Sequence, residues 1–236
     1  MSSDGPAHPH THHLRVQRTA RYYTLGGEGG AIRTIWFALH GYGQLAGEFI
    51  RYVAELADDE TLVVAPEAMN RFYLANVDKI PARDRPVGAT WMTREDRESE
   101  IADYVEYLDT LFDELGNGSA RVNVIGFSQG AATATRWATH GRSRIDRLIL
   151  WGGLVPPDSD LSKGHSALRH VQLTLVLGRR DHYVDDSMLA AEQARLDAAG
   201  IPYSVIRFDG GHAISRGVFP QLLEQTTLPV SGASDR

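Results

Sequence analysis

The chain has 236 residues, a length that suits one domain built from a sheet wrapped by helices, and it carries a formal net charge of −6. The negative charge argues against a nucleic-acid partner, because binding phosphates needs a surplus of Lys and Arg on one face. The absence of Cys excludes disulfides, thiolate metal sites and a Cys nucleophile, and no apolar run approaches the roughly 18 residues of a membrane span.

Residues 1–14 form a polar, His-rich segment that we predict to be a disordered tail. This segment holds no apolar stretch of the kind found in signal peptides, so a cytoplasmic location is expected. Because nothing apolar nearby would hold the imidazoles in one geometry, no metal site is expected there. Residues 15–228 are predicted to form a single domain, followed by a second disordered tail at residues 229–236.

Two strands are expected near the start of the domain, at residues 21–25 and 32–39, joined by a glycine-rich turn. The second ends in a continuous apolar run, which favours a strand buried on both faces of a parallel sheet. A helix is expected after Gln44, because four side chains share one helical stripe: Phe49, Tyr52, Val53 and Leu56. Residues 61–65 form the next expected strand.

Residues 66–92 show no clean periodicity and contain several Pro and Gly residues, so an irregular insertion is expected. Thr93 and the acidic residues that follow it resemble a capping box that would start the next helix. Apolar side chains then keep a helical spacing as far as a stop at Gly116: Ile101, Tyr104, Val105, Leu108, Leu111, Phe112 and Leu115.

The rest of the chain alternates strands with helices and shows no internal repeat. Strands are expected at residues 121–127, 147–151, 171–177 and 203–208. Helices are expected at residues 129–140, 187–199 and 218–225, with an irregular stretch at residues 152–170. This alternation predicts an α/β fold with a mostly parallel central sheet covered by helices on both faces.

The sequence Gly126-Phe127-Ser128-Gln129-Gly130 joins an expected strand to an expected helix. It matches the G-x-S-x-G nucleophile elbow, in which a sharp turn lifts the serine hydroxyl off the edge of the sheet. Glycines two positions either side leave room for the neighbouring strand and helix, and the helix N-terminus favours the negative charge that develops in acyl transfer. Ser128 is therefore the expected nucleophile.

A serine nucleophile needs a base, which in this chain order follows the last strand. His212 fits that place, because it comes directly after the strand expected to end at Phe208, within a loop that two glycines make flexible. The other His residues that follow Ser128 all lie upstream of the last strand and are interpreted as surface or loop residues: His140, His165, His170 and His182.

The acid that orients the base is expected after the strand before the last one. Asp181 occupies that place. Asp185 is the competitor, although it precedes an expected helix, where Asp is a common N-cap for structural reasons. Asp209 is discounted, because it lies three residues from His212 in the same short loop and would have to fold back on the ring it orients.

The sequence His40-Gly41-Tyr42-Gly43 follows the strand that leads to the oxyanion loop in such folds. The backbone N–H groups of Tyr42 and Gln129 are expected to bind the oxyanion, since the glycines permit a close approach of the backbone. The alternative is that the segment is an ordinary glycine-rich turn between a strand and a helix.

Together these motifs resemble the phospholipase/carboxylesterase/thioesterase family of small α/β-hydrolases, which includes acyl-protein thioesterases. The resemblance is carried in the expected order by residues 40–44, 126–130, 178–181 and 211–212, and the Gln after Ser128 sharpens it. The acyl-protein thioesterases usually have Gly at the position of Ala131, Asp at that of Gln44 and Pro at that of His182. Residues 90–97 are more similar to bacterial members of the esterase type.

The resemblance implies an α/β-hydrolase fold and hydrolysis of a small-molecule carboxylic ester through an acyl-enzyme, without a metal or organic cofactor. A thioester substrate, as in depalmitoylation, would use the same residues and remains an alternative. A second alternative is a binding module of this fold that holds a ligand without turning it over.

The insertion at residues 66–92 is expected to fold over the catalytic pocket, because ligands of open α/β sheets bind beyond the carboxyl ends of the strands. It carries apolar groups that a solvated loop would not need, and four of them are predicted to form an acyl-binding wall: Phe72, Tyr73, Trp91 and Met92. The alternative is that these side chains anchor the loop to the domain without touching the substrate.

Overall fold

A central sheet of seven strands organises the chain, as seen in a computed structural model that describes residues 10–28, 31–74, 80–115, 119–161 and 167–224. The strand order is β1-β3-β2-β6-β7-β8-β9, and every pair is parallel except β1 with β3. The strands are β1 (Tyr22–Gly26), β2 (Thr34–Leu39), β3 (Thr61–Pro66), β6 (Arg121–Phe127), β7 (Arg147–Trp151), β8 (Gln172–Gly178) and β9 (Tyr203–Phe208). The expected mostly parallel α/β sheet is confirmed, although β1 pairs with β3 and not with β2, to which the glycine-rich turn connects it.

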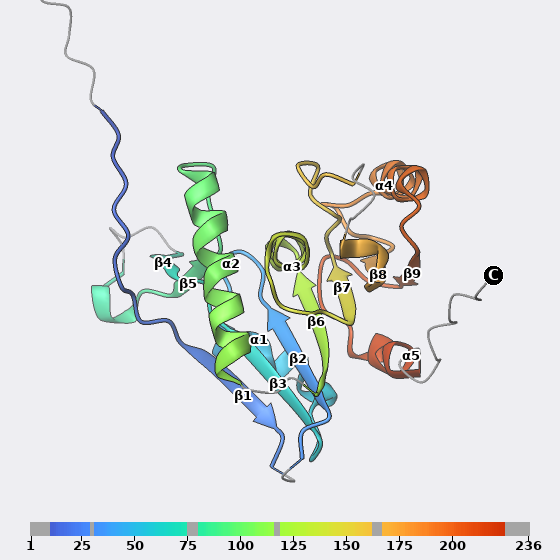
Figure 1. Cartoon of the computed structure of the whole chain (residues 1–236), viewed down its shortest axis with the longest axis horizontal. Coiled ribbons are helices and arrows are strands. Elements are labelled where there is room, and N and C mark those ends of the chain that lie inside the picture. The colour runs from blue at the N-terminus through green and yellow to red at the C-terminus, as the bar shows by residue number, and fades with distance from the viewer. Residues whose placement is uncertain (1–9, 29–30, 75–79, 116–118, 162–166, 225–236) are drawn as a thin grey trace, which may run out of the picture.

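Helices cover both faces of the sheet, as the sequence predicts (Figure 1). One face packs against α2 (Arg97–Glu114), α3 (Gln129–His140) and α4 (Asp186–Ala199). The other packs against α1 (Ala46–Phe49) and α5 (Phe219–Glu224). No helix in the described part of the chain is long and apolar enough to cross a membrane.

The continuous apolar run of β2 is buried on both faces of the sheet, as expected. Trp36 and Ala38 point into the layer that holds α1 and α5. Ile35, Phe37 and Leu39 point into the layer that holds α2 and α3. Burying a large apolar side chain such as Phe37 or Leu39 contributes about 1.5–3 kcal/mol to folding, so the core on both faces fixes the strands that carry the loops.

The prediction of one continuous helix after Gln44 is wrong as to the type of helix. A single α-helical turn, α1, is followed by two 3-10 turns at Ile50–Tyr52 and Ala54–Leu56. The buried residues Ile50, Val53 and Leu56 recur every third position, which matches the three-residue repeat of a 3-10 helix. Tyr52, placed on the predicted stripe, is 48% exposed.

The predicted capping box at Thr93 does not form. The helix starts later, at Arg97, and its N-cap Asp96 has a left-handed backbone with φ 48°. The Thr93 hydroxyl instead accepts a hydrogen bond from the Glu95 N–H at 3.1 Å, which closes a local turn before the helix. The apolar stripe of this helix faces the core as predicted, with Tyr104 and Leu108 fully buried.

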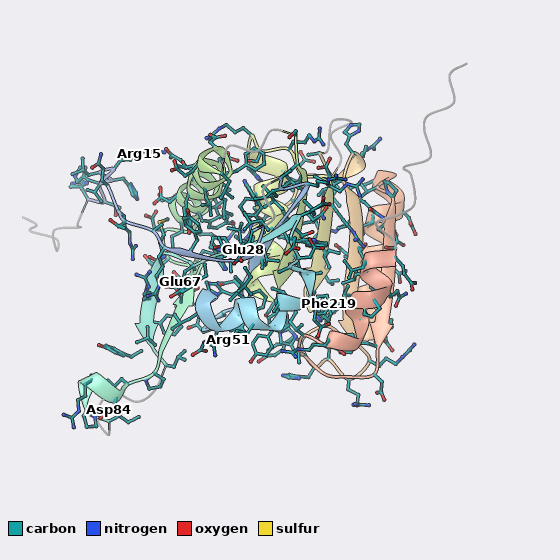
Figure 2. The ribbon with its side chains drawn as sticks, turned by 90° about the horizontal axis from the view of Figure 1, so that it is seen from below. Arg15, Glu28, Arg51, Glu67, Asp84 and Phe219 are labelled. Carbon is teal, nitrogen blue, oxygen red and sulfur yellow. The ribbon has the colours of Figure 1, made fainter. Side chains whose placement is uncertain are left out.

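The insertion at residues 66–92 is more regular than its sequence suggests. It holds an antiparallel ribbon of β4 (Asn70–Tyr73) and β5 (Val87–Thr90), with Asn70 opposite Thr90. Each strand has only four residues, too few to show a period in the sequence. The 3-10 turn Ala82–Asp84 lies between the two strands, and Figure 2 shows Asp84 at the outer end of the insertion, away from the sheet.

The segment before β1 is extended and runs beside α2 (Figure 1). Arg15 donates to Glu106 of α2 at 2.6 Å, and Arg18 donates to Asn70 of the ribbon at 3.1 Å. Residues 10–14 of the predicted N-terminal tail are exposed and form neither helix nor strand. The rest of that tail and the predicted tail at residues 229–236 lie outside the described residues, so the domain limits stay predictions.

Candidate active site

The backbone of Ser128 turns sharply between β6 and α3, with φ 55° and ψ −115°. Such a conformation costs a non-glycine residue about 1–3 kcal/mol and persists only where the surroundings fix it. Glycines at positions 126 and 130 make the turn possible, since a Cβ on Gly126 would lie 2.2 Å from the Gly130 carbonyl oxygen, and one on Gly130 2.1 Å from that of Leu39. The Ser128 N–H donates to the Trp151 carbonyl at 2.8 Å and ties the turn to β7.

The three residues predicted to act together lie in one hydrogen-bonded row. His212 Nε2 lies 2.9 Å from Ser128 Oγ, and His212 Nδ1 lies 2.8 Å from Asp181 Oδ2. The loops that carry Asp181 and His212 follow the neighbouring strands β8 and β9 and are joined directly, because the Arg180 N–H donates to the Gly210 carbonyl at 2.9 Å.

The carboxylate of Asp181 is held in one orientation. Its side chain is 1% exposed, and Oδ1 accepts hydrogen bonds from the N–H groups of Tyr183 at 2.8 Å and Val184 at 3.2 Å. Oδ2 is therefore the oxygen that faces the imidazole. A carboxylate only accepts, so His212 Nδ1 donates to it, and Nε2 is left to accept the proton of the Ser128 hydroxyl.

The competing carboxylates have other roles. Asp185 is the N-cap of α4, where its Oδ1 accepts the Met188 N–H at 2.8 Å, as expected of a structural Asp. Its hydrogen bonds with the Ser187 hydroxyl and the Met188 N–H lower the pKa of Asp185. The side chain of Asp209 is 79% exposed and pairs with Arg180.

Aromatic rings hold the imidazole of His212 in place. The ring centroid of Phe127 lies 5.0 Å from that of His212, and the Tyr183 ring meets the imidazole edge-on at 4.6 Å. The His212 side chain is 12% exposed, whereas Tyr183 is 63% exposed. The imidazole is therefore largely shielded from bulk water, while the Tyr183 ring beside it is open to solvent.

The backbone N–H groups of Tyr42 and Gln129 donate no hydrogen bond within the part of the chain that the structure describes. The loop that carries Tyr42 is closed by Gln44, whose Oε1 accepts the Gly41 N–H at 2.8 Å. A Cβ on Gly41 would lie 3.3 Å from Ser128 Cβ, so the loop touches the elbow. Two free donors beside a serine hydroxyl have the chemistry of an oxyanion hole.

His40, which the sequence analysis treated only as the first residue of the motif after β2, is a buried structural residue. Its ring is fully buried, its Nδ1–H donates to the Gly41 carbonyl at 2.8 Å, and its Nε2 accepts the Ala68 N–H at 3.1 Å. Burial lowers the pKa of His40, against the opposing effects of the Gly41 carbonyl and Glu67. The neutral imidazole thus joins the start of the loop after β2 to the residues that follow β3.

Comparison with known proteins gives the family. A family model described as phospholipase/carboxylesterase matches residues 30–227, most of the chain. The chain belongs to the phospholipase/carboxylesterase family. This bears out the resemblance found in the sequence, whereas no curated protein matches the chain.

Solved structures with the same fold include other proteins of this kind. Acyl-protein thioesterase 2 of Zea mays is 18% identical over 89% of this chain and 98% of its own, with a TM-score of 0.68. A carboxylesterase of Mesorhizobium loti is 17% identical over 89% and 95% of the two chains, with a TM-score of 0.66. Arabidopsis thaliana SOBER1 is 19% identical over 81% and 96%, with a TM-score of 0.62. At these identities the likeness establishes the α/β-hydrolase fold alone.

The predicted acyl-binding wall requires a correction at Trp91. The indole is 2% exposed, packs edge-on against Tyr104 with ring centroids 6.2 Å apart, and donates from Nε1 to the His40 carbonyl at 2.9 Å. Met92 is half-buried against the same core. Both side chains therefore anchor the insertion, because the end of β5 turns inward over α2 and α3.

Two other members of the predicted wall remain open to solvent. Phe72 is half-buried and packs on the exposed ring of Tyr42, with ring centroids 5.1 Å apart, so it lies beside the oxyanion loop. Tyr73 is 49% exposed and carries the Arg85 guanidinium on its ring at 5.6 Å. A substrate contact by Phe72 or Tyr73 stays a prediction.

We expect Trp91→Ala to lower the free energy of unfolding by about 3–5 kcal/mol, because it removes a buried aromatic side chain and leaves a cavity. The preference among acyl lengths in kcat/KM should stay unchanged. Denaturant unfolding and an ester series measure the two effects. Tyr73→Ala is the control, with a change within about 0.5 kcal/mol for an exposed site. A changed acyl-length preference at unaltered stability would restore Trp91 to the substrate wall.

The protein should become less stable as the pH falls below about 6.5, the ordinary pKa of His. The unfolded chain then binds a proton at position 40, whereas the folded protein keeps His40 neutral, so the free energy of unfolding drops by up to about 1.4 kcal/mol per pH unit. The effect is absent above that pH. Urea unfolding at about pH 7.5 and pH 5.5 measures the slope. His40→Gln cannot titrate, and an equal slope in that variant would contradict the assignment.

Proposed function

We propose that the protein is a serine hydrolase that cleaves small-molecule carboxylic esters through an acyl-enzyme. The observation that carries the proposal is the row Ser128–His212–Asp181, with contacts of 2.9 Å and 2.8 Å at the end of a nucleophile elbow. This arrangement lies beside two unpaired backbone donors, which is the geometry that acyl transfer requires.

The first half of the reaction forms the acyl-enzyme. Ser128 Oγ attacks the ester carbonyl carbon while its proton passes to His212 Nε2. The carbonyl oxygen becomes an oxyanion and accepts hydrogen bonds from the N–H groups of Tyr42 and Gln129. As the carbon–oxygen bond to the alcohol breaks, the proton on Nε2 passes to the leaving oxygen, and the acyl group remains on Ser128.

The second half returns the free enzyme. A water molecule gives a proton to His212 Nε2 and attacks the acyl carbon, and the proton is then passed to Ser128 Oγ as the carboxylic acid leaves. Asp181 accepts the hydrogen bond from His212 Nδ1–H, keeps the ring in this orientation and stabilises the imidazolium. These steps require no metal or organic cofactor.

A thioester substrate is the second candidate, since the same residues would expel a thiol in place of an alcohol. The similarity of fold to an acyl-protein thioesterase raises this possibility. A binding module without turnover is the third. All three candidate functions are compatible with the same nucleophile elbow, so only measurements of turnover can distinguish an esterase, a thioesterase and a binding module.

A fluorophosphonate tests the proposal, because it forms a covalent adduct with an activated serine. We expect an adduct on Ser128 by peptide mass spectrometry, together with hydrolysis of a series of esters of graded acyl length. Matched thioesters assign the leaving-group preference. An intact protein without an adduct and without turnover of either series would contradict the proposal and favour the binding module.

A further inference from the structure

The residues at the end of β5 contact both segments that carry the proposed oxyanion donors. We call residues 89–92 the bracket. Tyr42 lies on the loop after β2, and Gln129 lies at the start of α3 after β6. The bracket is a third segment, distant from Ser128 in the sequence, that hydrogen-bonds to both.

The bracket binds the Tyr42 loop mainly through its backbone. The Gly43 N–H donates to the Ala89 carbonyl at 2.9 Å, and the Ala89 N–H donates to the Gln44 carbonyl at 3.2 Å, so the loop adds to the edge of β5 like a short strand. The Trp91 indole completes the contact through its hydrogen bond to the His40 carbonyl. The loop is therefore fixed on both sides of Tyr42.

On the elbow side, the Gln129 side chain hydrogen-bonds to three residues of the bracket, and Arg136 further along α3 contacts only the Met92 sulfur, at 3.4 Å. Its Oε1 accepts the Trp91 N–H at 3.1 Å, while its Nε2 donates to the Met92 carbonyl at 2.8 Å and to Thr90 Oγ1 at 2.9 Å. The amide suits these partners, because it offers one acceptor to an N–H and donors to oxygens. The half-buried Gln129 also carries one of the two free N–H groups.

We propose that the Gln129 side chain is a positioning residue that sets the separation between the two oxyanion donors. The inference rests on the proposed function, because it assigns a task within the same site. Donors of this kind must be held within about 0.5 Å of the productive geometry. Gln129 links its own backbone N–H, through the bracket, to the loop of Tyr42.

Two variants of Gln129 test the proposal. Gln129→Met keeps the length of the side chain and removes every hydrogen bond to the bracket. Gln129→Glu keeps the acceptor for the Trp91 N–H but turns a second carboxylate oxygen toward the Met92 carbonyl, so it should be at least as damaging. Thr139→Val is the matched control, since it removes a side-chain hydrogen bond of 2.9 Å to the Thr135 carbonyl at the far end of α3.

For Gln129→Met we expect kcat to fall by about tenfold to a hundredfold, less than the loss of a whole oxyanion donor, with KM within about twofold. The inhibition constant of a trifluoromethyl ketone should rise by the same factor, because this inhibitor binds as an oxyanion. The pH profile of kcat/KM should keep its shape, since the contacts of His212 are untouched. Thr139→Val should leave all of these values unchanged.

Crystal structures of the wild type and Gln129→Met measure the separation of the Tyr42 and Gln129 amide nitrogens without reference to turnover. A changed separation supports the proposal, and an unchanged one overturns it. A loss of thermal stability with kcat and ketone affinity intact would overturn it as well, since the side chain would then only support the fold. A wild type without hydrolase activity would instead refute the proposed function, while the two structures still decide whether Gln129 sets the spacing.

Discussion

Ser128→Ala should abolish ester hydrolysis and fluorophosphonate labelling together, with kcat falling on the order of a millionfold, as for removal of the nucleophile in other serine triads. The reason is that Oγ at this position is the atom 2.9 Å from His212 Nε2, and an alanine offers His212 nothing to activate. Hydrolysis of a chromogenic ester and intact-protein mass spectrometry measure the two losses.

The matched control for this change is Ser99→Ala, which removes a half-exposed hydroxyl that donates to Asp96 at 3.1 Å on α2. Labelling and hydrolysis should both persist in the control. If Ser128→Ala still hydrolyses the ester at the wild-type rate and carries the adduct on another residue, the nucleophile lies elsewhere.

Asp181→Asn should lower kcat by about 10⁴-fold while the protein still folds. The structure dictates how the new amide must lie, because the oxygen at the Oδ1 position accepts the N–H groups of Tyr183 and Val184. The NH₂ group then faces His212 Nδ1 and donates to it. Nδ1 becomes an acceptor, the proton moves to Nε2, and the imidazole can no longer take the proton from Ser128.

Asp185→Asn is the control for the acid. Asn is as good an N-cap as Asp, so α4 should stay capped and kcat should change little. Circular dichroism and melting temperature check that both variants are folded. A large loss of kcat in Asp185→Asn with a mild effect of Asp181→Asn would transfer the orienting role to Asp185.

The central features of the candidate site are readable from the sequence because each is local. The elbow around Ser128 is a contiguous motif with a strand before it and a helix after it. His212 and Asp181 follow from the order of the strands, since the carboxyl ends of parallel strands meet at one edge of the sheet. The family resemblance uses the same short segments.

The features that the sequence missed depend on contacts between distant segments. Nothing local shows that β5 pairs with the loop after β2, or that the Gln129 side chain reaches Met92, 37 positions away. An apolar residue in an aperiodic loop is equally compatible with a pocket wall and with the core. No feature of the sequence therefore indicated that Trp91 is buried. The three-residue spacing of Ile50, Val53 and Leu56 fits a 3-10 helix, but including Tyr52 in the apolar stripe led to the prediction of an α-helix.

The positive-φ turn at Ser128 places the hydroxyl of the proposed nucleophile where an ordinary residue is strained by about 1–3 kcal/mol, a cost that glycine would avoid. Function and thermodynamic robustness therefore conflict at this one position. Selection for heat resistance alone would exchange the serine for glycine and leave a more robust but inert protein. A more heat-resistant form that still turns over substrate must gain its stability in other parts of the chain, where backbone geometry and chemistry do not compete.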